Sequence, residues 1–341
     1  MKYEDQLKTT AKAMLAPGKG LLAADESSGT VAKRFDAVNL DNTEENRRLY
    51  RQLLLSAPGN EKFVSGVILY DETIRQKDDN SMPFAEVLKA KGIVPGIKVD
   101  MGAKDLALHP GEKVTEGLDG LRERFEEYAK MGAGFAKWRA VITIEGNELP
   151  SQACLTANAH ALARYAALAQ EAGIVPVVEP EILLDGDHSI ERCYEATVAT
   201  LDALFGQLKS QGVLMEGTIL KASMVLSGKG APDRADIQTV AEQTVKCLKE
   251  HVPSNLAGVV FLSGGQSEEE ATAHLDAMNK IGGLPWPLTF SYSRAIQNPV
   301  LKLWAAGEKD KAQAAYLHRC EANSLAAEGK WSEAFEQNRP Y

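Results

Sequence analysis

The sequence predicts an α/β fold: a single (β/α)8 (TIM) barrel with extra N- and C-terminal helices and a short C-terminal tail. Predicted strands and helices alternate along the chain, the strands number eight, and most of them are apolar. Apolar strands are typical of parallel sheets that are covered on both faces, and eight strand–helix units are typical of a closed barrel. An open doubly wound sheet is the structural alternative, but no G-x-G-x-x-G follows the first strand.

The elements follow from hydrophobic periodicity and from the residues that end each segment. An amphipathic helix over about 1–16 stops at Ala16-Pro17-Gly18, and no Pro/Gly/Ser linker divides the 341 residues, so we expect one domain over 1–341. Glycine ends several helices. The predicted strands are 19–25, 64–70, 93–100, 135–139, 174–181, 217–223, 258–263 and 287–292. The predicted helices are 46–57, 117–134, 150–172, 190–210, 233–251, 268–283, 294–306 and 309–329, followed by a polar tail over about 330–341.

Composition excludes several classes of partner. The chain is 44% hydrophobic and 25% charged, with a formal net charge of -9, which argues against nucleic acid and anionic membrane as partners. It has no run of about 18 apolar residues that could span a bilayer. The four cysteines are far apart and the six histidines are scattered, so we expect a cytoplasmic protein and no metal site.

Charged residues collect where the predicted strands end. In a barrel of this kind, the C-terminal ends of the strands meet at one mouth, where the chemistry takes place. Residues two apart on a strand share a face, so three strands can each direct two polar side chains toward this mouth. The residues at these positions are Asp25, Lys98, Asp100, Lys137, Arg139, Glu179, Glu181, Lys221 and Ser263.

Lys221 is the unusual member of this group, because it lies within the apolar run GTILKAS. Burial and neighbouring ammonium groups favour an uncharged amine, which can add to a ketone. We expect Glu179 and Glu181 to share one proton, so that one donates while the other stays ionised. Dehydration of a carbinolamine to a Schiff base needs such an acid.

Two loops have the character of anion sites. LSGGQSEEE places Ser263, Gly264 and Gly265 before a helix N-terminus, and SYSRA places Ser291 and Arg294 before another. Glycines let backbone N–H groups approach an anion, and the helix dipole favours it. A second anion site is predicted in DESSGTVAKR, which carries Ser27 and Arg34.

These motifs resemble class I fructose-1,6-bisphosphate aldolase. The strings that carry the resemblance run in family order from about residue 19 to 297: LAADESSGTVAKR, GIKVD, GFAKWR, GIVPVVEPEIL, GTILKASMV, FLSGGQSEEEA and LTFSYSRA. The resemblance implies a (β/α)8 barrel, usually a homotetramer, that acts on phosphorylated sugars without a cofactor or metal. The implied reaction is the reversible cleavage of fructose 1,6-bisphosphate to dihydroxyacetone phosphate and glyceraldehyde 3-phosphate.

Carried over position by position, the resemblance makes Lys221 the Schiff-base lysine and Glu179 the acid/base for dehydration and carbon–carbon cleavage. Glu181 supports Glu179, Asp25 orients the intermediate, and Lys137 maintains the charge balance. Tyr341 matches the terminal tyrosine that takes part in proton exchange on the enamine. The C1-phosphate pocket matches Ser263, Gly264, Gly265, Ser291 and Arg294, and the other phosphate end matches Ser27, Arg34, Lys98 and Arg139.

The chain departs from the family pattern in two places. Ser293 stands where well-known members have glycine, and the approach to Tyr341, SEAFEQNRP, is short and dissimilar. Three alternatives remain open at this point. These are sedoheptulose 1,7-bisphosphate as main or additional substrate, a non-catalytic phosphosugar-binding scaffold, and a metal-dependent aldolase.

Overall fold

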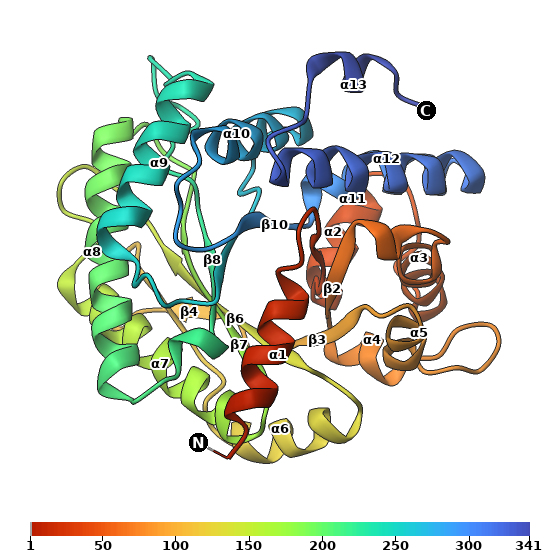
Figure 1. The fold of residues 1–341 in the computed structure, drawn as a ribbon, viewed down its shortest axis with the longest axis horizontal. Coiled ribbons are helices and arrows are strands. Elements are labelled where there is room, and N and C mark those ends of the chain that lie inside the picture. Colours follow the sequence, from red (N-terminus) through yellow and green to blue (C-terminus); the bar gives the residue numbers. More distant parts are fainter. Residues whose placement is uncertain (1) are drawn as a thin grey trace.

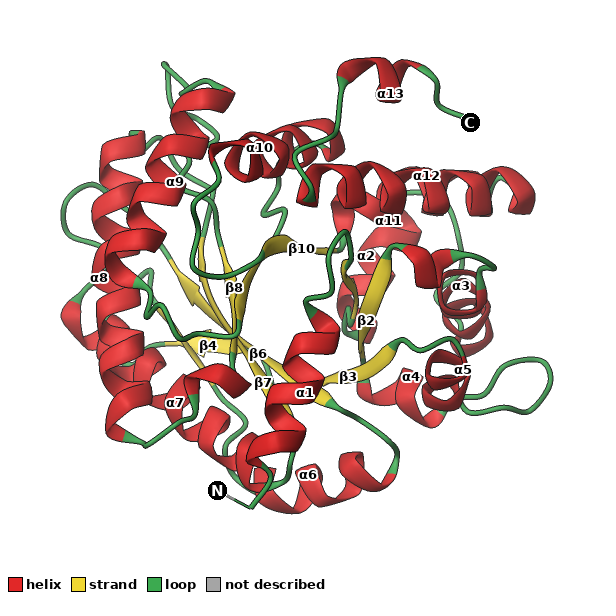
Figure 2. Ribbon diagram, in the orientation of Figure 1, coloured by secondary structure: helices red, strands yellow, loops and turns green. Residues whose placement is uncertain are grey.

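A closed barrel of eight parallel strands forms the centre of the molecule, as the computed structural model shows for residues 2–341 (Figures 1 and 2). The strand order is β1-β10-β9-β8-β7-β6-β3-β2, and β1 pairs with both β2 and β10, which closes the ring. The predicted fold class is therefore confirmed, and the open-sheet alternative is wrong. The strands are β1 Gly20–Ala24, β2 Val64–Leu69, β3 Val94–Lys98, β6 Phe135–Ile142, β7 Val175–Ile182, β8 Ile219–Ala222, β9 Gly258–Phe261 and β10 Leu288–Tyr292.

Helices surround the barrel, and several begin where the sequence offers a capping side chain. Ser151, Ser189 and Ser267 each accept a hydrogen bond from the backbone N–H three residues later, which stabilises the helix start. The helix predicted from 233 begins only at Ile237, because Asp236 takes the capping position. The helices are α1 Glu4–Met14, α2 Ser28–Asp36, α3 Glu44–Ser56, α4 Asp71–Arg75, α5 Phe84–Ala90, α6 Leu121–Lys130, α7 Gln152–Glu171, α8 Ile190–Ser210, α9 Ile237–His251, α10 Glu268–Ile281, α11 Arg294–Ala305, α12 Lys309–Ala327 and α13 Glu333–Gln337, with 3-10 turns at Asn60–Lys62 and Met215–Gly217.

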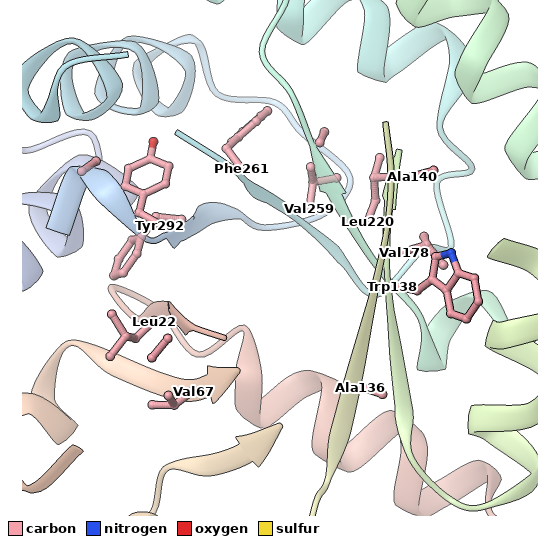
Figure 3. Packing of buried hydrophobic residues seen from close by; sticks show 14 of the residues in the cluster. Leu22, Val67, Ala136, Trp138, Ala140, Val178, Leu220, Val259, Phe261 and Tyr292 are labelled. Atoms are coloured by element: carbon pink, nitrogen blue, oxygen red, sulfur yellow. The ribbon is translucent and has the colours of Figure 1, made fainter. Parts of the chain in front are cut away.

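The outward faces of the strands form the main hydrophobic core with the helices. Figure 3 shows Trp138, Val178 and Leu220, which alternate along their strands with the charged residues Lys137, Glu179 and Lys221. The indole of Trp138 stacks on Tyr165 of α7 with 5.6 Å between ring centroids. Because side chains of a strand alternate between its two faces, this outward packing turns the charged residues into the barrel.

The inward faces are apolar at the N-terminal end of the barrel. Val177 and Ile219 pack there with Leu7, Ala11 and Met14 of α1 in a second buried cluster. Helix α1 crosses this end of the barrel in Figure 1. The barrel is thus closed at one end by hydrocarbon, and the polar part of its interior is confined to the C-terminal end.

Several features differ from the sequence prediction. Helices α2, α4 and α5 were not among the predicted helices. An antiparallel hairpin, β4 Ala103–Asp105 with β5 Lys113–Thr115, follows β3, and its tip exposes Leu108. Strand β6 continues to Ile142, and the polar tail contains the short helix α13. Within the described part of the chain, no helix has the length and apolar character needed to cross a membrane.

Candidate active site

The strand register brings the predicted charged residues together at one level of the barrel. Lys98 of β3 lies beside Lys137 of β6, and Arg139 of β6 lies beside Glu179 of β7. Lys221 is the third residue of the four-residue strand β8. Since parallel strands all point the same way, these positions converge at the C-terminal mouth, as the period-two spacing predicts.

A cavity of about 1030 Å³ opens at this mouth. Of the predicted site residues, only Gly265 and Tyr341 are not among those that line it. Gly265 is adjacent to the lining: a Cβ atom built there would lie 3.9 Å from Nη2 of Arg294. The predicted residues that line the cavity are Asp25, Ser27, Arg34, Lys98, Lys137, Arg139, Glu179, Glu181, Lys221, Ser263, Gly264, Ser291 and Arg294.

A chain of ion pairs crosses the floor of the cavity. Nζ of Lys221 lies 3.0 Å from Oε1 of Glu179, whose Oε2 lies 3.1 Å from Nζ of Lys137. Nζ of Lys137 also lies 2.8 Å from Oδ2 of Asp25. All four residues are less than one-tenth exposed, so two ammonium groups and two carboxylates compensate each other away from water.

The electrostatics of this chain keep both carboxyl groups ionised. Burial by itself raises the pKa of Asp25, but the charges of Lys137 and Lys221 outweigh it and hold that pKa at about 2. Burial likewise raises the pKa of Glu179, and Lys137, Lys221 and Arg139 reverse the effect, so its pKa falls below the ordinary value. Burial lowers the pKa of Lys137, but Asp25 and Glu179 outweigh this and raise it.

Lys221 contacts a carboxylate, Glu179, whose other oxygen contacts a second ammonium group, Lys137, so lysines and carboxylates are mixed as the sequence predicts. One expectation about this cluster needs correction. Glu179 and Glu181 do not share a proton, because Glu179 is ionised between two lysines and Glu181 accepts a hydrogen bond from Nε of Arg139. Sequence spacing placed both carboxylates on one face of β7 but did not show which cation each would contact.

One side of the cavity has the character of an anion pocket, which we call the first phosphate pocket. Gly264 and Gly265 adopt φ values of +49° and +92°, a region that favours glycine and turns the backbone of the β9–α10 loop. Oγ of Ser291 is buried without a hydrogen-bond partner among residues 2–341. The pocket comprises Ser263, Gly264, Gly265, Ser291 and Arg294.

A second set of donors, which we call the second phosphate pocket, consists of Ser27, Arg34, Lys98 and Arg139. Ser27 caps α2 by accepting a hydrogen bond from the N–H of Thr30, and Nζ of Lys98 contacts Oδ1 of Asp100 at 2.7 Å. Nη2 of Arg34 is buried, and no described residue accepts a hydrogen bond from it. A buried donor without a partner is costly, and a bound anion would satisfy it.

Glu26 is a lining residue that the sequence analysis missed. Its carboxylate is held by Arg34 and by Arg51 of α3, the latter at 2.7 Å. Burial raises the pKa of Glu26, but both guanidinium groups outweigh it and lower that pKa. Period two predicts that Glu26 faces away from Asp25, and nothing in the sequence of α3 indicated that Arg51 would meet it.

Ser293 does not carry the backbone strain that a glycine position suggests. Its φ is -107°, so a side chain is tolerated, and its hydroxyl donates to Oε1 of Glu26 at 2.6 Å. The departure from the family pattern therefore adds a hydrogen bond beside the phosphate pockets instead of distorting them.

Tyr341 lies outside the cavity in this structure. Its ring makes an edge contact with His318 of α12, with 5.7 Å between centroids, and Figure 1 places the C-terminus beyond α13. Arg319 of α12 is fully buried and forms an ion pair with Glu336, which anchors α13 of the tail to α12. A catalytic role for Tyr341 stays a prediction, and it requires that the last residues leave this position.

Replacement of Tyr341 with phenylalanine is expected to leave the rate of sugar cleavage within about twofold of the wild type. The same change should slow proton exchange at C3 of dihydroxyacetone phosphate, because the family resemblance assigns the hydroxyl to that step alone. Single-turnover cleavage and detritiation of the labelled triose phosphate measure the two steps separately. An equal loss in both would contradict this division of roles.

Acid is expected to weaken the fold through Asp25. Its pKa is about 2 in the folded protein against an ordinary 3.8, so its contribution is present above about pH 4 and is lost as the pH falls toward 2. The shift corresponds to about 2 kcal/mol. Urea unfolding at a series of pH values should show a smaller decline over this window in Asp25→Asn than in the wild type, and equal declines would refute the assignment.

Comparison with known proteins agrees with this geometry. The family described as "Fructose-bisphosphate aldolase class-I" matches residues 6–340. "Probable fructose-bisphosphate aldolase class 1" of Xanthomonas campestris pv. campestris is 60% identical over 330 residues, covering 96% of this chain and 98% of the relative. "Fructose-bisphosphate aldolase 5, cytosolic" of Arabidopsis thaliana is 51% identical over 334 residues, covering 97% and 93%.

A solved structure extends the similarity to three dimensions. The fructose-bisphosphate aldolase of Plasmodium falciparum, crystallised with TRAP and a small-molecule inhibitor, superposes with a TM-score of 0.95 at 47% identity, covering 97% of this chain and 96% of that one. Family, sequence and fold agree over nearly the whole length. The chain therefore belongs to the class I fructose-bisphosphate aldolase family.

Proposed function

We propose that this protein cleaves fructose 1,6-bisphosphate through a Schiff base on Lys221. The observation that carries the proposal is the contact between Nζ of Lys221 and the carboxylate of Glu179 at 3.0 Å, in a cavity lined by two sets of anion donors. An amine must lose its proton before it attacks a ketone, and this contact supplies the acceptor.

Formation of the Schiff base begins with proton transfer from Lys221 to Glu179. The neutral amine attacks C2 of the open-chain sugar, and the oxygen at C2 takes up the proton that the attacking nitrogen loses, which gives a carbinolamine. Glu179 returns its proton to that hydroxyl, which leaves as water and gives a protonated imine. Lys137, 3.1 Å from the other oxygen of Glu179, stabilises the carboxylate whenever it is ionised.

Cleavage uses the same carboxylate as a base. Glu179 accepts the proton of the C4 hydroxyl, the C3–C4 bond breaks, and its electron pair moves into the imine to form an enamine. Glyceraldehyde 3-phosphate leaves. The enamine then takes a proton at C3, the step assigned to Tyr341, and water releases dihydroxyacetone phosphate from Lys221. Asp25, which shares Lys137 with Glu179, orients the intermediate, and Glu181 holds Arg139 beside it.

The phosphate groups of the substrate occupy the two pockets at the cavity walls. The phosphate on C1 binds Ser291, Arg294 and the glycine loop, where a helix start favours an anion. The phosphate on C6 binds Ser27, Arg34, Lys98 and Arg139. The net charge of -9 does not oppose this binding, since the cations of the cavity set the local field.

Borohydride reduction in the presence of fructose 1,6-bisphosphate tests the Schiff base directly. We expect a covalent mass increase on the peptide that contains Lys221, with or without a chelator, because no metal takes part in the proposed steps. No adduct on that peptide would refute the proposal. Dependence of activity on a chelator-sensitive ion would favour the metal-dependent alternative.

Substrate range, assembly and location are finer parts of the same proposal. An open site rejects one extra carbon only weakly, so sedoheptulose 1,7-bisphosphate must be tested directly. Borohydride trapping and turnover measured with this sugar decide the seven-carbon alternative. We further propose a cytoplasmic homotetramer. The plant relative named as cytosolic supports the location, and sedimentation of the purified protein tests the assembly.

A further inference from the structure

Ser293 occupies the N-cap position of α11 but does not cap that helix. Serine at this position normally accepts a hydrogen bond from an N–H of the first turn, and here no such side-chain bond is made. Its hydroxyl instead donates to Oε1 of Glu26 at 2.6 Å, and Nη1 of Arg34 approaches it at 3.4 Å. The side chain therefore serves the second phosphate pocket rather than its own helix.

The bond partners of Ser293 are themselves fixed. Nε2 of Gln297 donates to Oε1 of Glu26 at 3.0 Å and to the backbone carbonyl of Ala23 at 2.7 Å, and it lies 3.2 Å from the Ser293 hydroxyl. Arg51, which is 3% exposed and does not line the cavity, holds the other oxygen of Glu26 at 2.7 Å. Glu26 is thus a rigid acceptor for Arg34.

This arrangement divides the Arg34 guanidinium into two parts. Nη1 is held by Glu26 and reaches Ser293, whereas Nη2 is buried without an acceptor in the described chain. A guanidinium held by one edge presents its remaining donor in a defined direction, so less side-chain freedom is lost when an anion binds.

We propose that Ser293 is a positioning residue that couples the two phosphate pockets and favours bisphosphates over monophosphates. It lies in the chain between Ser291 and Arg294 of the first pocket, and its hydroxyl orients Arg34 of the second through Glu26. The relative position of the two anion sites is then fixed by a bond between the ends of the neighbouring strands β1 and β10. This inference rests on the proposed function, because it assigns Arg34 to the C6 phosphate.

The test is Ser293→Ala with fructose 1,6-bisphosphate and fructose 1-phosphate as paired substrates. Loss of a hydrogen bond to a buried carboxylate should raise KM for the bisphosphate about tenfold and leave KM for the monophosphate within about twofold. Ser293→Thr keeps the hydroxyl and should therefore keep the ratio of the two KM values at that of the wild type. In an Arg34→Ala background, Ser293→Ala should have no further effect, because the serine acts through that arginine.

Ser189→Ala is the matched control, since Ser189 caps α8 and does not line the cavity. It should lower stability without changing either KM. An equal rise of both KM values in Ser293→Ala, no rise in either, or an effect that persists without Arg34 would overturn the inference.

Calorimetry with hexitol 1,6-bisphosphate and hexitol 1-phosphate gives the same comparison without turnover. A wild-type protein that cleaves neither sugar would therefore refute the proposed function, while binding would still decide the role of Ser293.

Discussion

Replacement of Lys221 with methionine is expected to lower kcat/KM for fructose 1,6-bisphosphate by at least about 10⁴-fold. The change removes the amine proposed to form the covalent intermediate, and Lys137, the other amine at the floor of the cavity, is held between Asp25 and Glu179. Methionine is similar in length, and Glu179 retains Lys137 at 3.1 Å, so the fold should persist. Steady-state kinetics and circular dichroism measure the two expectations.

Lys229→Met is the matched control for this change. Lys229 is exposed in the loop after β8 and does not line the cavity, so its replacement should leave kcat/KM within about twofold. The Lys221→Met protein should still bind hexitol 1,6-bisphosphate, because both phosphate pockets remain. Activity within about 100-fold of the wild type would contradict covalent catalysis by Lys221. Unchanged biological function in this variant would favour the scaffold alternative.

Replacement of Glu179 with glutamine is expected to lower kcat by about 10²–10⁴-fold, the usual range for loss of a general acid/base. The amide can neither accept the proton of Lys221 nor return one to the carbinolamine, so Schiff-base formation and cleavage should slow together. Rapid-quench measurements of borohydride-trapped enzyme and of released triose phosphate follow the two steps. A loss confined to cleavage would limit Glu179 to the second step.

Glu181→Gln is the informative comparison, because the two carboxylates lie two residues apart on β7. Glu181 contacts Arg139 rather than either buried lysine, so its replacement should cost less than that of Glu179. We expect a smaller fall in kcat and a rise in KM, since Arg139 belongs to the second phosphate pocket. Equal losses of kcat in the two variants would indicate that the carboxylates act as one unit.

Most of the barrel was predictable because it depends on local patterns. Alternation of strand and helix, glycine at helix ends and capping serines are all properties of short segments. The hairpin at Ala103–Thr115 was missed because its strands are only three residues long and carry no hydrophobic alternation, and all but Thr115 of their residues are fully or partly exposed. The start of α9 was misplaced by four residues, because Asp236 caps the helix and residues 233–235 precede it in the loop.

The sequence by itself determined which residues share the mouth of the barrel, because period two and parallel register follow from backbone geometry alone. Only the tertiary structure decided how those residues pair: Lys221 with Glu179, Arg139 with Glu181, and Arg34 with Glu26. It also showed that the hydroxyl of Ser293 donates a hydrogen bond to Glu26. It also placed Tyr341 against α12 and outside the cavity. Partner choice among buried charges depends on distances of a few ångströms between segments far apart in the chain, and no local pattern encodes those distances.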